Sequence, residues 1–414
     1  MIHGKQIPVR SCGEVLTRRR SNHLKEPHLL IIPSVPVWLQ GKGLIFDRKF
    51  YDGMALYAQK WPGHVSCLME TTTSPLPEFG AINKTAQELP FSCITIEKGT
   101  LIDAEHLKGA SLVLASGDSH DQLHISRLCR KEKIKCVYVI EYIPETRYQI
   151  ASLSTRNLLI KLRRFLYIWQ YEKKRVAAFL LADALQSNGT PAYHEYKRFK
   201  NNLLYFDTRV DIQHSIRDLE LEKRLDDLSQ GKPLRLAFSG RLIQMKGADH
   251  LITLARMLKK ERLPFHMTIY GTGDLENEMK KNIQLHQLEN FVSMPGAVDF
   301  YTELIPDLKQ KIDLFISLHR QSDPSCTYLE TLSCGLPIVG YKNKAFAGLL
   351  ELANIGWGAK LNDLDEVKKI IIHLDNNRTV ISEKSRASIL FSRLHDFDTT
   401  FNNRVNHLLS TLEQ

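Results

Sequence analysis

Short runs of apolar residues recur along the chain, and longer amphipathic segments lie between them. The apolar runs occupy residues 28–34, 110–116, 135–142, 182–188, 234–240, 265–271, 291–296, 313–318 and 336–341. Between them, segments such as 248–261 and 274–288 place apolar residues three and four positions apart, which is typical of amphipathic helices. Continuous apolar strands that alternate with helices predict parallel sheets covered on both faces.

The strands and helices form two series, separated by a polar, charged stretch at 207–233. A chain of 414 residues is long enough for two hydrophobic cores. We therefore predict an α/β fold of two doubly wound, Rossmann-like domains that face a cleft. The first domain is predicted over 1–206 and the second over 207–385.

The composition is that of an ordinary globular protein, with 43% hydrophobic and 25% charged residues. The sequence has no apolar run long enough to cross a bilayer, and its N-terminal stretch lacks the apolar core of a secretory signal. Its seven cysteines include no Cys-x-x-Cys pair, which favours a reducing compartment over disulfides or structural zinc. We expect a cytoplasmic protein.

Positive charge is concentrated in the first half of the chain. Residues 1–206 hold 29 lysines and arginines and 18 acidic residues, whereas the remainder is close to neutral. This asymmetry indicates an anionic partner, such as a membrane surface, a phosphorylated lipid or a nucleic acid, although a merely basic surface is the alternative. The stretch 156–175 mixes seven basic residues with aromatic and aliphatic ones. It fits either an amphipathic helix on a membrane or a helix packed on its own domain. No RNA-binding signature accompanies the charge.

Candidate ligand-binding residues follow the predicted strands of the second domain, where ligands bind in open α/β sheets. Arg241 and Lys246 come after the strand at 234–240, just before a helix that starts near Gly247. Two cations beside a helix N-terminus suit a diphosphate, although cations at strand ends are also common without a role.

Glycine turns follow the next two strands. Gly271 and Gly273 form a Gly-x-Gly turn that allows close backbone approach to a phosphate, although it lacks the third glycine of a dinucleotide fingerprint. Gly296, Ala297 and Val298 follow the strand at 291–296 and offer a backbone turn that can face a flat base.

A fourth segment, SDPSCTYLETLSCGLPIVGY at 322–341, predicts a short helix that leads into a strand. Ser325 or Thr327 can cap this helix, and Gly335 ends it. Glu330 lies near its N-terminus, where a carboxylate is also favourable simply by compensating the helix dipole.

In order, the motifs S-G-R-L-x-x-x-K-G, G-x-G-x-L, P-G-x-V and D-P-S-x-T-Y-L-E-x-L-x-C-G-L-P-I-V-G-Y resemble the C-terminal domain of glycosyltransferase family 4 (group 1). The Asp-Pro-Ser version looks like a branch found among polysaccharide-assembly enzymes. The resemblance covers roughly 232–345 and implies the GT-B fold. It also implies a final helix, over 386–414, that crosses back to the N-terminal domain.

The resemblance implies roles for individual residues. Arg241 and Lys246 would bind the donor diphosphate, and Glu330 would accept hydrogen bonds from the ribose hydroxyls. The family has a second glutamate eight positions earlier, beside the transferred sugar, but this chain has Ser322 there and an acid next door at Asp323. The further donor-binding residues that we expect are Gly240, Gly271, Gly273, Ala297, Val298, Ser325 and Thr327.

The chemistry implied is retaining glycosyl transfer, in which cations and a helix N-terminus stabilise the departing diphosphate. The resemblance implies no metal and no cofactor apart from a UDP- or GDP-linked sugar as co-substrate. Two Asp-x-Asp triplets, 363–365 and 396–398, follow the last strand and are poor candidates for a metal site.

Signals for the acceptor are sparser. Asp118 and His120 directly follow the strand at 110–116. Family members often carry a histidine in such a loop, and we predict a catalytic role for His120 together with Arg241, Lys246 and Asp323. A strand-end histidine without a role is the alternative. The other acceptor-side candidates are Gly41, Gly43, Glu141, Glu145 and Arg147.

These observations predict a hexosyltransferase-type enzyme of cell-surface polysaccharide biosynthesis, with a lipid-linked or polysaccharide acceptor and no nucleic-acid partner. It would be cytoplasmic and peripheral on the inner face of the plasma membrane. A nucleotide-sugar epimerase and a non-catalytic partner of another transferase, both with the GT-B fold, are the alternatives. Calorimetric measurement of nucleotide binding distinguishes a non-catalytic partner from an enzyme.

Overall fold

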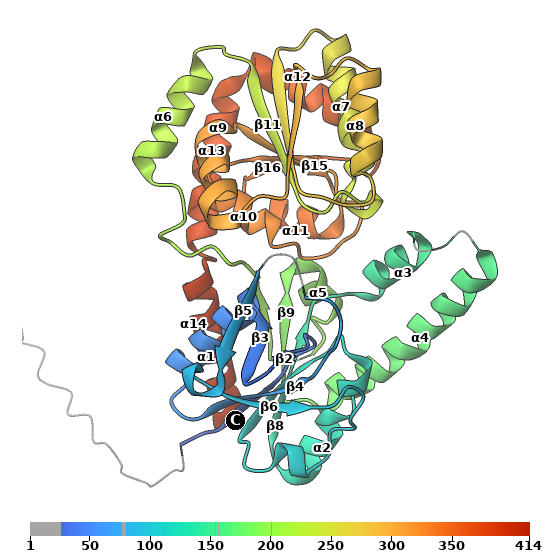
Figure 1. Cartoon of the computed structure of the whole chain (residues 1–414), viewed down its shortest axis with the longest axis vertical. Helices are drawn as coiled ribbons and strands as arrows, with labels where there is room; N and C mark the ends of the chain where they lie inside the picture. The colour runs from blue at the N-terminus through green and yellow to red at the C-terminus, as the bar shows by residue number, and fades with distance from the viewer. Residues whose placement is uncertain (1–25, 77–79, 154, 156, 200) are drawn as a thin grey trace, which may run out of the picture.

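The computed structural model describes residues 26–76, 80–153, 155, 157–199 and 201–414. Two α/β domains are stacked along the long axis of the molecule and are joined by a linker and by the C-terminal helix (Figure 1). The N-terminal stretch for which we expect no signal peptide lies outside the described residues.

The N-terminal domain is built on a parallel sheet with strand order β10-β9-β8-β7-β1-β4-β6. Its strands are β1 Leu29–Ile32, β4 Val65–Glu70, β6 Ser92–Ile96, β7 Leu112–Ser116, β8 Lys135–Ile140, β9 Ala184–Asn188 and β10 Asn202–Tyr205. The helices are α1 Arg48–Lys60, α2 Ile125–Glu132, α3 Pro144–Leu153, α4 Leu158–Leu181 and α5 Gly189–Glu195. Buried aliphatic side chains on both faces of β1, β7 and β8 explain why these strands read as continuous apolar runs.

A small antiparallel sheet, β2 Trp38–Gln40, β3 Gly43–Asp47 and β5 Ala81–Thr85, accompanies the N-terminal domain. Strands β2 and β3 pair across a tight turn at Gly41 and Lys42. Gly41 has a φ of +59°, which glycine adopts without steric cost. The glycine loop predicted on the acceptor side is therefore a hairpin turn.

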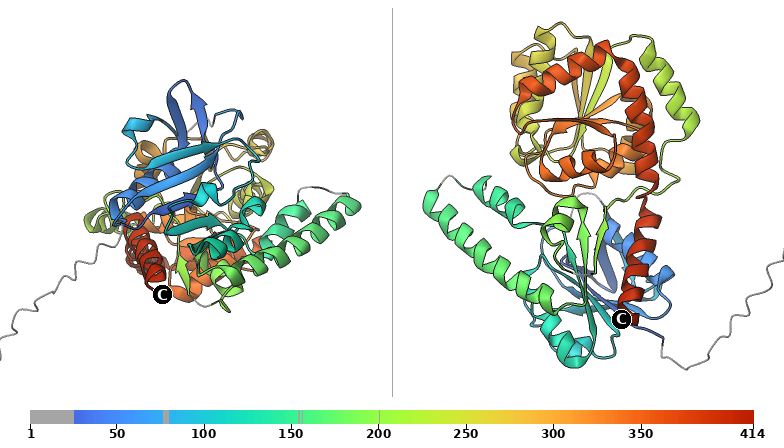
Figure 2. Two further views of the ribbon diagram at one scale, coloured as in Figure 1. Left: turned by 90° about the horizontal axis from the view of Figure 1, so that it is seen from below. Right: turned by 180° about the vertical axis from the view of Figure 1, so that it is seen from behind.

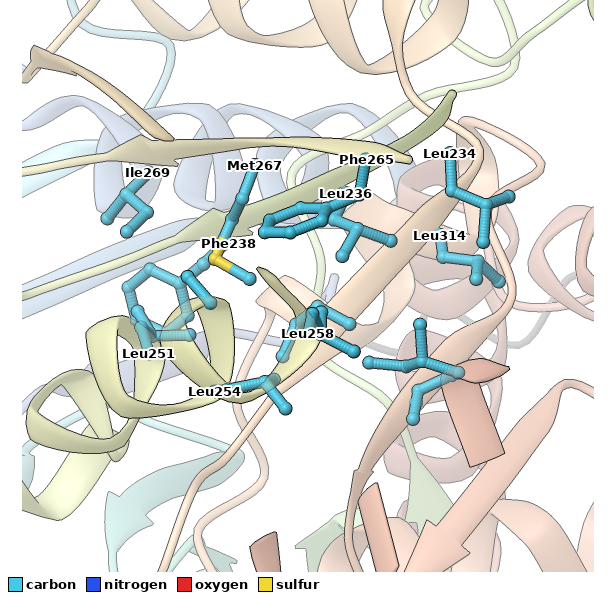
Figure 3. Packing of buried hydrophobic residues seen from close by; sticks show 14 of the residues in the cluster. Leu234, Leu236, Phe238, Leu251, Leu254, Leu258, Phe265, Met267, Ile269 and Leu314 are labelled. Atoms are coloured by element: carbon cyan, nitrogen blue, oxygen red, sulfur yellow. The ribbon is translucent and has the colours of Figure 1, made fainter. Parts of the chain in front are cut away.

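The C-terminal domain has a second parallel sheet, with order β13-β12-β11-β14-β15-β16. Its strands are β11 Leu234–Ser239, β12 Phe265–Tyr270, β13 Val292–Gly296, β14 Leu314–Ser317, β15 Ile338–Tyr341 and β16 Gly356–Ala359. The helices are α6 Asp218–Ser229, α7 Ala248–Lys260, α8 Glu276–Leu285, α9 Ile305–Lys311, α10 Thr327–Ser333, α11 Lys344–Leu352, α12 Leu364–Asn376 and α13 Arg378–Arg393. Figure 3 shows Phe238 of β11 and Met267 of β12 packed above Leu251 and Leu254 of α7.

All the strands that the apolar pattern predicts are present, and the predicted pair of Rossmann-like α/β domains is confirmed. Strands β4, β6, β10 and β16 and the antiparallel sheet were not predicted. Strand β6 is partly exposed at the edge of its sheet, and β16 contains two glycines, which are unfavourable in strands.

The last helix, α14 Phe397–Glu413, lies against the N-terminal domain (Figure 2, right). Phe401 packs edge-on against Tyr57 of α1, with ring centroids 5.0 Å apart. The Arg404 guanidinium donates to Oε1 of Gln186 on β9 at 2.8 Å. Packing and hydrogen bonds therefore hold the end of the chain on the first domain.

Candidate functional site

The loops at the carboxyl ends of both sheets meet at the junction between the domains. The loop after β14 contacts α3, and Lys344, which begins α11 after β15, forms an ion pair with Glu145 of α3. On the other side, Gly189 after β9 lies so close to Pro324 that an added Cβ would be 2.7 Å from the proline Cβ. The junction is therefore formed by the strand ends at which open α/β sheets bind ligands.

The loop after β11 brings Lys246 to this junction. Lys246 is buried, and its Nζ lies 2.9 Å from Oδ2 of Asp323, in the loop after β14. Gly247 has a φ of +72°, and a Cβ there would lie 2.0 Å from the carbonyl oxygen of Leu318, so the close packing of these loops requires glycine. Arg241 is exposed at the start of the same loop. The structure thus brings together two of the predicted catalytic residues, Lys246 and Asp323.

The loop after β14 contains buried polar atoms without hydrogen-bond partners among the described residues. They are both ring nitrogens of His319, Oε1 of Gln321 and Oδ1 of Asp323. Burial, assisted by the charge of Lys246, lowers the pKa of His319 well below its usual value, so its imidazole is neutral. Because buried polar groups are normally paired, this cluster has hydrogen-bonding capacity left for a ligand.

Glu330 is buried on α10 and is already paired. Its Oε1 accepts a hydrogen bond at 2.8 Å from Nε of Arg209, which lies on the linker between the two sheets. The Arg209 guanidinium also stacks on the ring of Phe300, 3.8 Å from its centre. Burial alone would lower the pKa of Arg209, but the Glu330 carboxylate raises it. Glu330, the residue predicted to bind the ribose, is therefore paired with an arginine of the protein itself.

The predicted glycine turns lie at the ends of neighbouring strands. Gly240 after β11 and Gly271 after β12 are in close backbone contact, since a Cβ on Gly271 would lie 2.1 Å from the Gly240 carbonyl oxygen. Gly273 continues the turn beside Leu242. Ala297 is exposed, whereas Val298 packs against the apolar cluster of the domain. The hydroxyls of Ser325 and Thr327 lie 3.2 Å apart at the start of α10.

Ser322, which stands where the family has a glutamate, joins the two domains. Its backbone N–H donates to Oε1 of Gln149 at 3.0 Å, and its carbonyl oxygen accepts from the Thr146 hydroxyl at 3.3 Å. Its own hydroxyl accepts from the backbone N–H of Lys344 at 3.2 Å. This buried serine therefore ties the loop after β14 to α3 and α11.

A cavity of about 330 Å³ lies on the N-terminal side of the junction. It is lined by the ends of β1, β7 and β8, by α1 and by residues of the linker and α14. Glu141 and Asp118, both at strand ends, face it together with Asp207 and Lys49. Burial, followed by the nearby charges of Asp207 and Asp118, raises the pKa of Glu141 to about 7. The cavity thus holds a carboxyl group that gains and loses its proton near neutral pH.

Asp118 and Arg147 form one network beside this cavity. Asp118 accepts from the backbone N–H of Glu141 at 2.6 Å, from Arg147 at 2.6 Å and from Arg175 at 3.1 Å. His120 points elsewhere and stacks on Tyr171 of α4, with ring centroids 5.3 Å apart. Asp118 therefore lines the cavity, whereas His120, Gly41 and Gly43 are not among its lining residues.

Sequence reasoning missed a contact between three distant segments. Lys49 of α1 donates to Asp207 of the linker and, at 2.8 Å, to Sγ of Cys326 at the start of α10. Burial raises the pKa of the Cys326 thiol to about 12, so the thiol is neutral. No local pattern marks these residues, because their partners lie more than a hundred positions apart.

The Asp-x-Asp triplets have structural roles. Asp363 accepts from the backbone N–H of Glu366 at 2.9 Å, and Asp396 accepts from that of Thr399 at 2.9 Å, so both cap helices. In the described parts of the chain, no cluster of three His, Cys, Asp or Glu side chains is placed to hold a metal ion. Nor does any described helix have the length and apolarity to cross a bilayer.

Fold and site together define a two-domain α/β architecture of the GT-B type, with the candidate ligand-binding residues at the carboxyl ends of the strands. The family model for glycosyl transferases group 1 matches residues 221–389, which are most of the C-terminal domain. The predicted resemblance to group 1 glycosyltransferases is therefore confirmed for this domain, whereas assignment to family 4 stays a prediction.

Curated relatives point the same way. The chain is 26% identical over 210 residues to the amylovoran biosynthesis glycosyltransferase AmsK of Erwinia amylovora, covering 48% of this chain and 47% of AmsK. It is 26% identical over 145 residues to the putative colanic acid biosynthesis glycosyltransferase WcaL of Salmonella typhimurium, covering 32% of this chain and 34% of WcaL. The matched part thus spans about half, or less, of these relatives.

The fold is shared by solved structures at low sequence identity. HepE from Anabaena, crystallised in complex with UDP, superimposes with a TM-score of 0.62 at 13% identity, covering 93% of this chain and all of HepE. At this identity the likeness concerns the fold alone, and it extends over both domains.

Proposed function

We propose that the protein is a retaining, hexosyltransferase-type glycosyltransferase of cell-surface polysaccharide biosynthesis. It would transfer a sugar from a UDP- or GDP-linked donor to a lipid-linked or growing polysaccharide acceptor. The group 1 family match and the relatives of amylovoran and colanic acid biosynthesis support this function. The protein would act in the cytoplasm, at the inner face of the plasma membrane.

The observation that carries the proposal is the group of unpartnered polar atoms in the loop after β14. His319, Gln321 and Asp323 offer a buried imidazole, an amide oxygen and a carboxylate oxygen within five positions. A sugar hydroxyl group can donate to such acceptors and accept from donors in the same site. Lys246 lies beside this group, where a cation would face the donor diphosphate.

In the proposed reaction, the bond between the anomeric carbon of the sugar and the diphosphate breaks, and the sugar develops oxocarbenium character. The acceptor hydroxyl oxygen would bond to that carbon on the same face and give its proton to the departing phosphate. Arg241 and Lys246 would stabilise the negative charge that grows on the departing phosphate, which is the largest catalytic contribution expected of such groups. Glu330 would accept hydrogen bonds from two ribose hydroxyls after Arg209 has moved away from it. Gly240, Gly271 and Gly273 would let the backbone approach the phosphates.

The acceptor would enter the cavity of the N-terminal domain. Its volume of about 330 Å³ is at the lower end of the range for small-molecule sites, so it suits a terminal sugar unit rather than a long chain. Glu141 would contact the incoming hydroxyl, because its pKa near 7 keeps both protonation states available. A catalytic role for His120 stays a prediction.

Calorimetric titration with UDP, GDP, ADP and CMP tests the donor site. We expect one diphosphate to bind, and we expect Glu330→Gln to weaken that binding by at least about tenfold, because the neutral amide is a weaker acceptor for hydroxyl groups. Glu289→Gln, at an exposed position of the same domain, is the matched control and should bind like the parent protein. If none of the nucleotides binds, the transferase proposal is wrong.

A second candidate function is a non-catalytic partner of another transferase. The role of Ser322 favours it, because the position where the family has its sugar-side glutamate instead joins the domains. Incubation with the nucleotide sugar of the diphosphate that binds separates the two candidates. Release of the nucleotide or transfer of the sugar supports the enzyme, and the anomeric configuration of the product tests retention. Binding without any turnover supports the partner.

A further inference from the structure

Helices α3 and α4 form an arm that extends sideways from the N-terminal domain (Figure 1; Figure 2, left). Tyr148 of α3 packs edge-on against Phe165 of α4, with ring centroids 5.0 Å apart, which holds the two helices together. The predicted basic stretch 156–175 is confirmed as helix from residue 158 onward, and residue 156 lies outside the described residues.

Helix α4 has two apolar faces rather than one. Ile168, Tyr171 and Phe179 are buried and pack the helix on its own domain. A second set faces away from them at intervals of three and four residues, which places it along one side of the helix. This outer stripe consists of Leu159, Leu162, Leu166 and Trp169, whose exposed fractions are 77%, 57%, 53% and 52%. The interpretation as a helix packed on its own domain is therefore confirmed for the buried face, whereas the interpretation as a membrane-surface helix stays a prediction for the outer stripe.

Basic residues lie on the same helix as the outer stripe. Helix α4 carries Lys161, Arg163, Arg164, Lys173 and Lys174 in addition to the buried Arg175. By helical spacing, Arg163, Lys173 and Lys174 are the ones beside the outer stripe, whereas Lys161 and Arg164 are on the other side. Its one acidic residue, Glu172, is held by Arg175 at 2.9 Å and by the hydroxyl of Tyr196 at 2.8 Å. Nζ of Lys173 lies 3.4 Å from the centre of the Trp169 ring. The exposed surface of α4 thus combines an apolar stripe, a tryptophan and excess positive charge.

We propose that the arm docks on an anionic lipid bilayer through this outer stripe. A helix with leucines and tryptophan on one side and lysines and arginines beside them lies in the plane of the membrane, with its apolar side among the acyl chains. Anionic headgroups attract the flanking cations, and tryptophan is favourable at the interface. The concentration of basic residues in 1–206 adds to this attraction.

The biological purpose of the docking rests on the proposed function, because docking would hold the acceptor cavity near a lipid-linked acceptor. The docking surface itself does not depend on that function. The arm is also tied to the second domain, because α3 forms the ion pair between Glu145 and Lys344. A membrane-bound arm would therefore orient both domains relative to the bilayer.

Sedimentation with lipid vesicles tests the docking surface in the full-length protein. We expect the protein to bind vesicles in which a third of the phosphatidylcholine is replaced by phosphatidylglycerol, and to bind pure phosphatidylcholine at least about tenfold more weakly. Leu162→Glu/Leu166→Glu should reduce binding to the anionic vesicles by at least about tenfold. Leu219→Glu/Leu285→Glu, at exposed leucines of the C-terminal domain, is the matched control and should bind normally.

Three results would overturn the inference. The first is no binding of the parent protein to anionic vesicles, and the second is equal binding by the arm variant. The third is a stable dimer that Leu162→Glu/Leu166→Glu converts to monomer, since a second copy of the chain would then cover the stripe. Because the substituted leucines are exposed, the variant should keep its melting temperature and its nucleotide affinity. Loss of nucleotide binding in the parent protein would contradict the proposed function and leave the docking result unaffected.

Discussion

The two sides of the domain junction differ in whether their buried carboxyl groups have ion-pair partners. On the C-terminal side, Glu330 is compensated by Arg209, and Asp323 by Lys246. On the N-terminal side, Asp118 is held by Arg147 and Arg175, but among the described residues Glu141 has no ion-pair partner. Its pKa rises to about 7 in consequence of burial and the neighbouring Asp207 and Asp118.

This difference fits the two kinds of ligand that the halves would bind. A nucleotide sugar brings negative charge and ribose hydroxyls, so a donor site needs cations and a carboxylate. These groups exchange their ion-pair partners for the ligand when it binds. An acceptor brings a neutral hydroxyl, for which a carboxyl group that changes protonation near pH 7 is better suited than a permanently paired one. The comparison leads to three predictions about the junction.

The largest effect is expected from Lys246→Met, which removes a buried cation from the proposed diphosphate site. Donor turnover should fall by about 10²- to 10³-fold, because a preorganised group that stabilises developing phosphate charge contributes to that extent. The measurement is kcat/KM for the nucleotide sugar. Lys281→Met, at an exposed position of α8, should leave turnover unchanged.

Removal of Lys246 also leaves Asp323 as an unpaired, largely buried carboxylate, so the variant can lose stability as well. The double variant Lys246→Met/Asp323→Asn tests the loss of stability, because it removes the unpaired carboxylate together with the cation, whereas its turnover also reflects the loss of Asp323 as a proposed sugar-binding residue. It should regain the melting temperature of the parent protein without regaining turnover. Recovery of turnover in the double variant would show that Lys246 serves only to neutralise Asp323.

The next prediction concerns the uncompensated carboxyl of the N-terminal side. An unperturbed glutamate titrates at pH 4.5, and Glu141 titrates at about 7 in the folded protein. Between these values the folded protein binds more protons than the unfolded chain, so stability falls as the pH rises through this window and stays lower above it. Glu141→Gln removes this loss. The variant should be more stable than the parent by about 3 kcal/mol at pH 8, and equally stable at pH 4.

Melting curves of the parent protein, Glu141→Gln and Glu289→Gln across this pH range measure the effect. The difference between parent and Glu141→Gln should grow from pH 4.5 to 7, whereas Glu289→Gln should follow the parent throughout. A constant difference would show that the carboxyl of Glu141 keeps an ordinary pKa, and the contrast between the two sides of the junction would then be wrong.

The sequence could place the candidate residues of the C-terminal side at one edge of the sheet because the signals for these residues are local, whereas their roles stay predictions. Lys246 lies in the loop after strand β11, and Glu330 lies on the short helix that follows strand β14 and its loop; parallel strands bring their carboxyl ends to one edge of the sheet. The positive charge of the segment 156–175 was also visible, since its composition alone shows it. The same local logic found Asp118 and Glu141 at strand ends, although it favoured His120 over Asp118.

What could not be predicted depends on contacts between distant residues. Arg209 lies in a polar linker and is 121 positions from Glu330, so no spacing rule connects them. The contact between Lys49, Asp207 and Cys326 likewise joins three separate segments. The second apolar face of α4 was hidden for a related reason, because only the fold shows which leucines its own domain covers.

The smallest effect is expected from Arg209→Gln, which tests whether Arg209 occupies the place of the ribose. If Glu330 binds the ribose hydroxyls, the nucleotide must first displace the Arg209 guanidinium, and a partly exposed ion pair of this kind contributes about 1 kcal/mol. Arg209→Gln should therefore tighten binding of the diphosphate by about fivefold. Calorimetry measures the change, with Arg217→Gln, which breaks an exposed arginine–glutamate pair on α6, as the control. Weaker binding would instead show that Arg209 turns from Glu330 to the diphosphate and serves as a third cation beside Arg241 and Lys246. The donor site would then be completed by the linker, and its affinity would depend on how the two domains are joined.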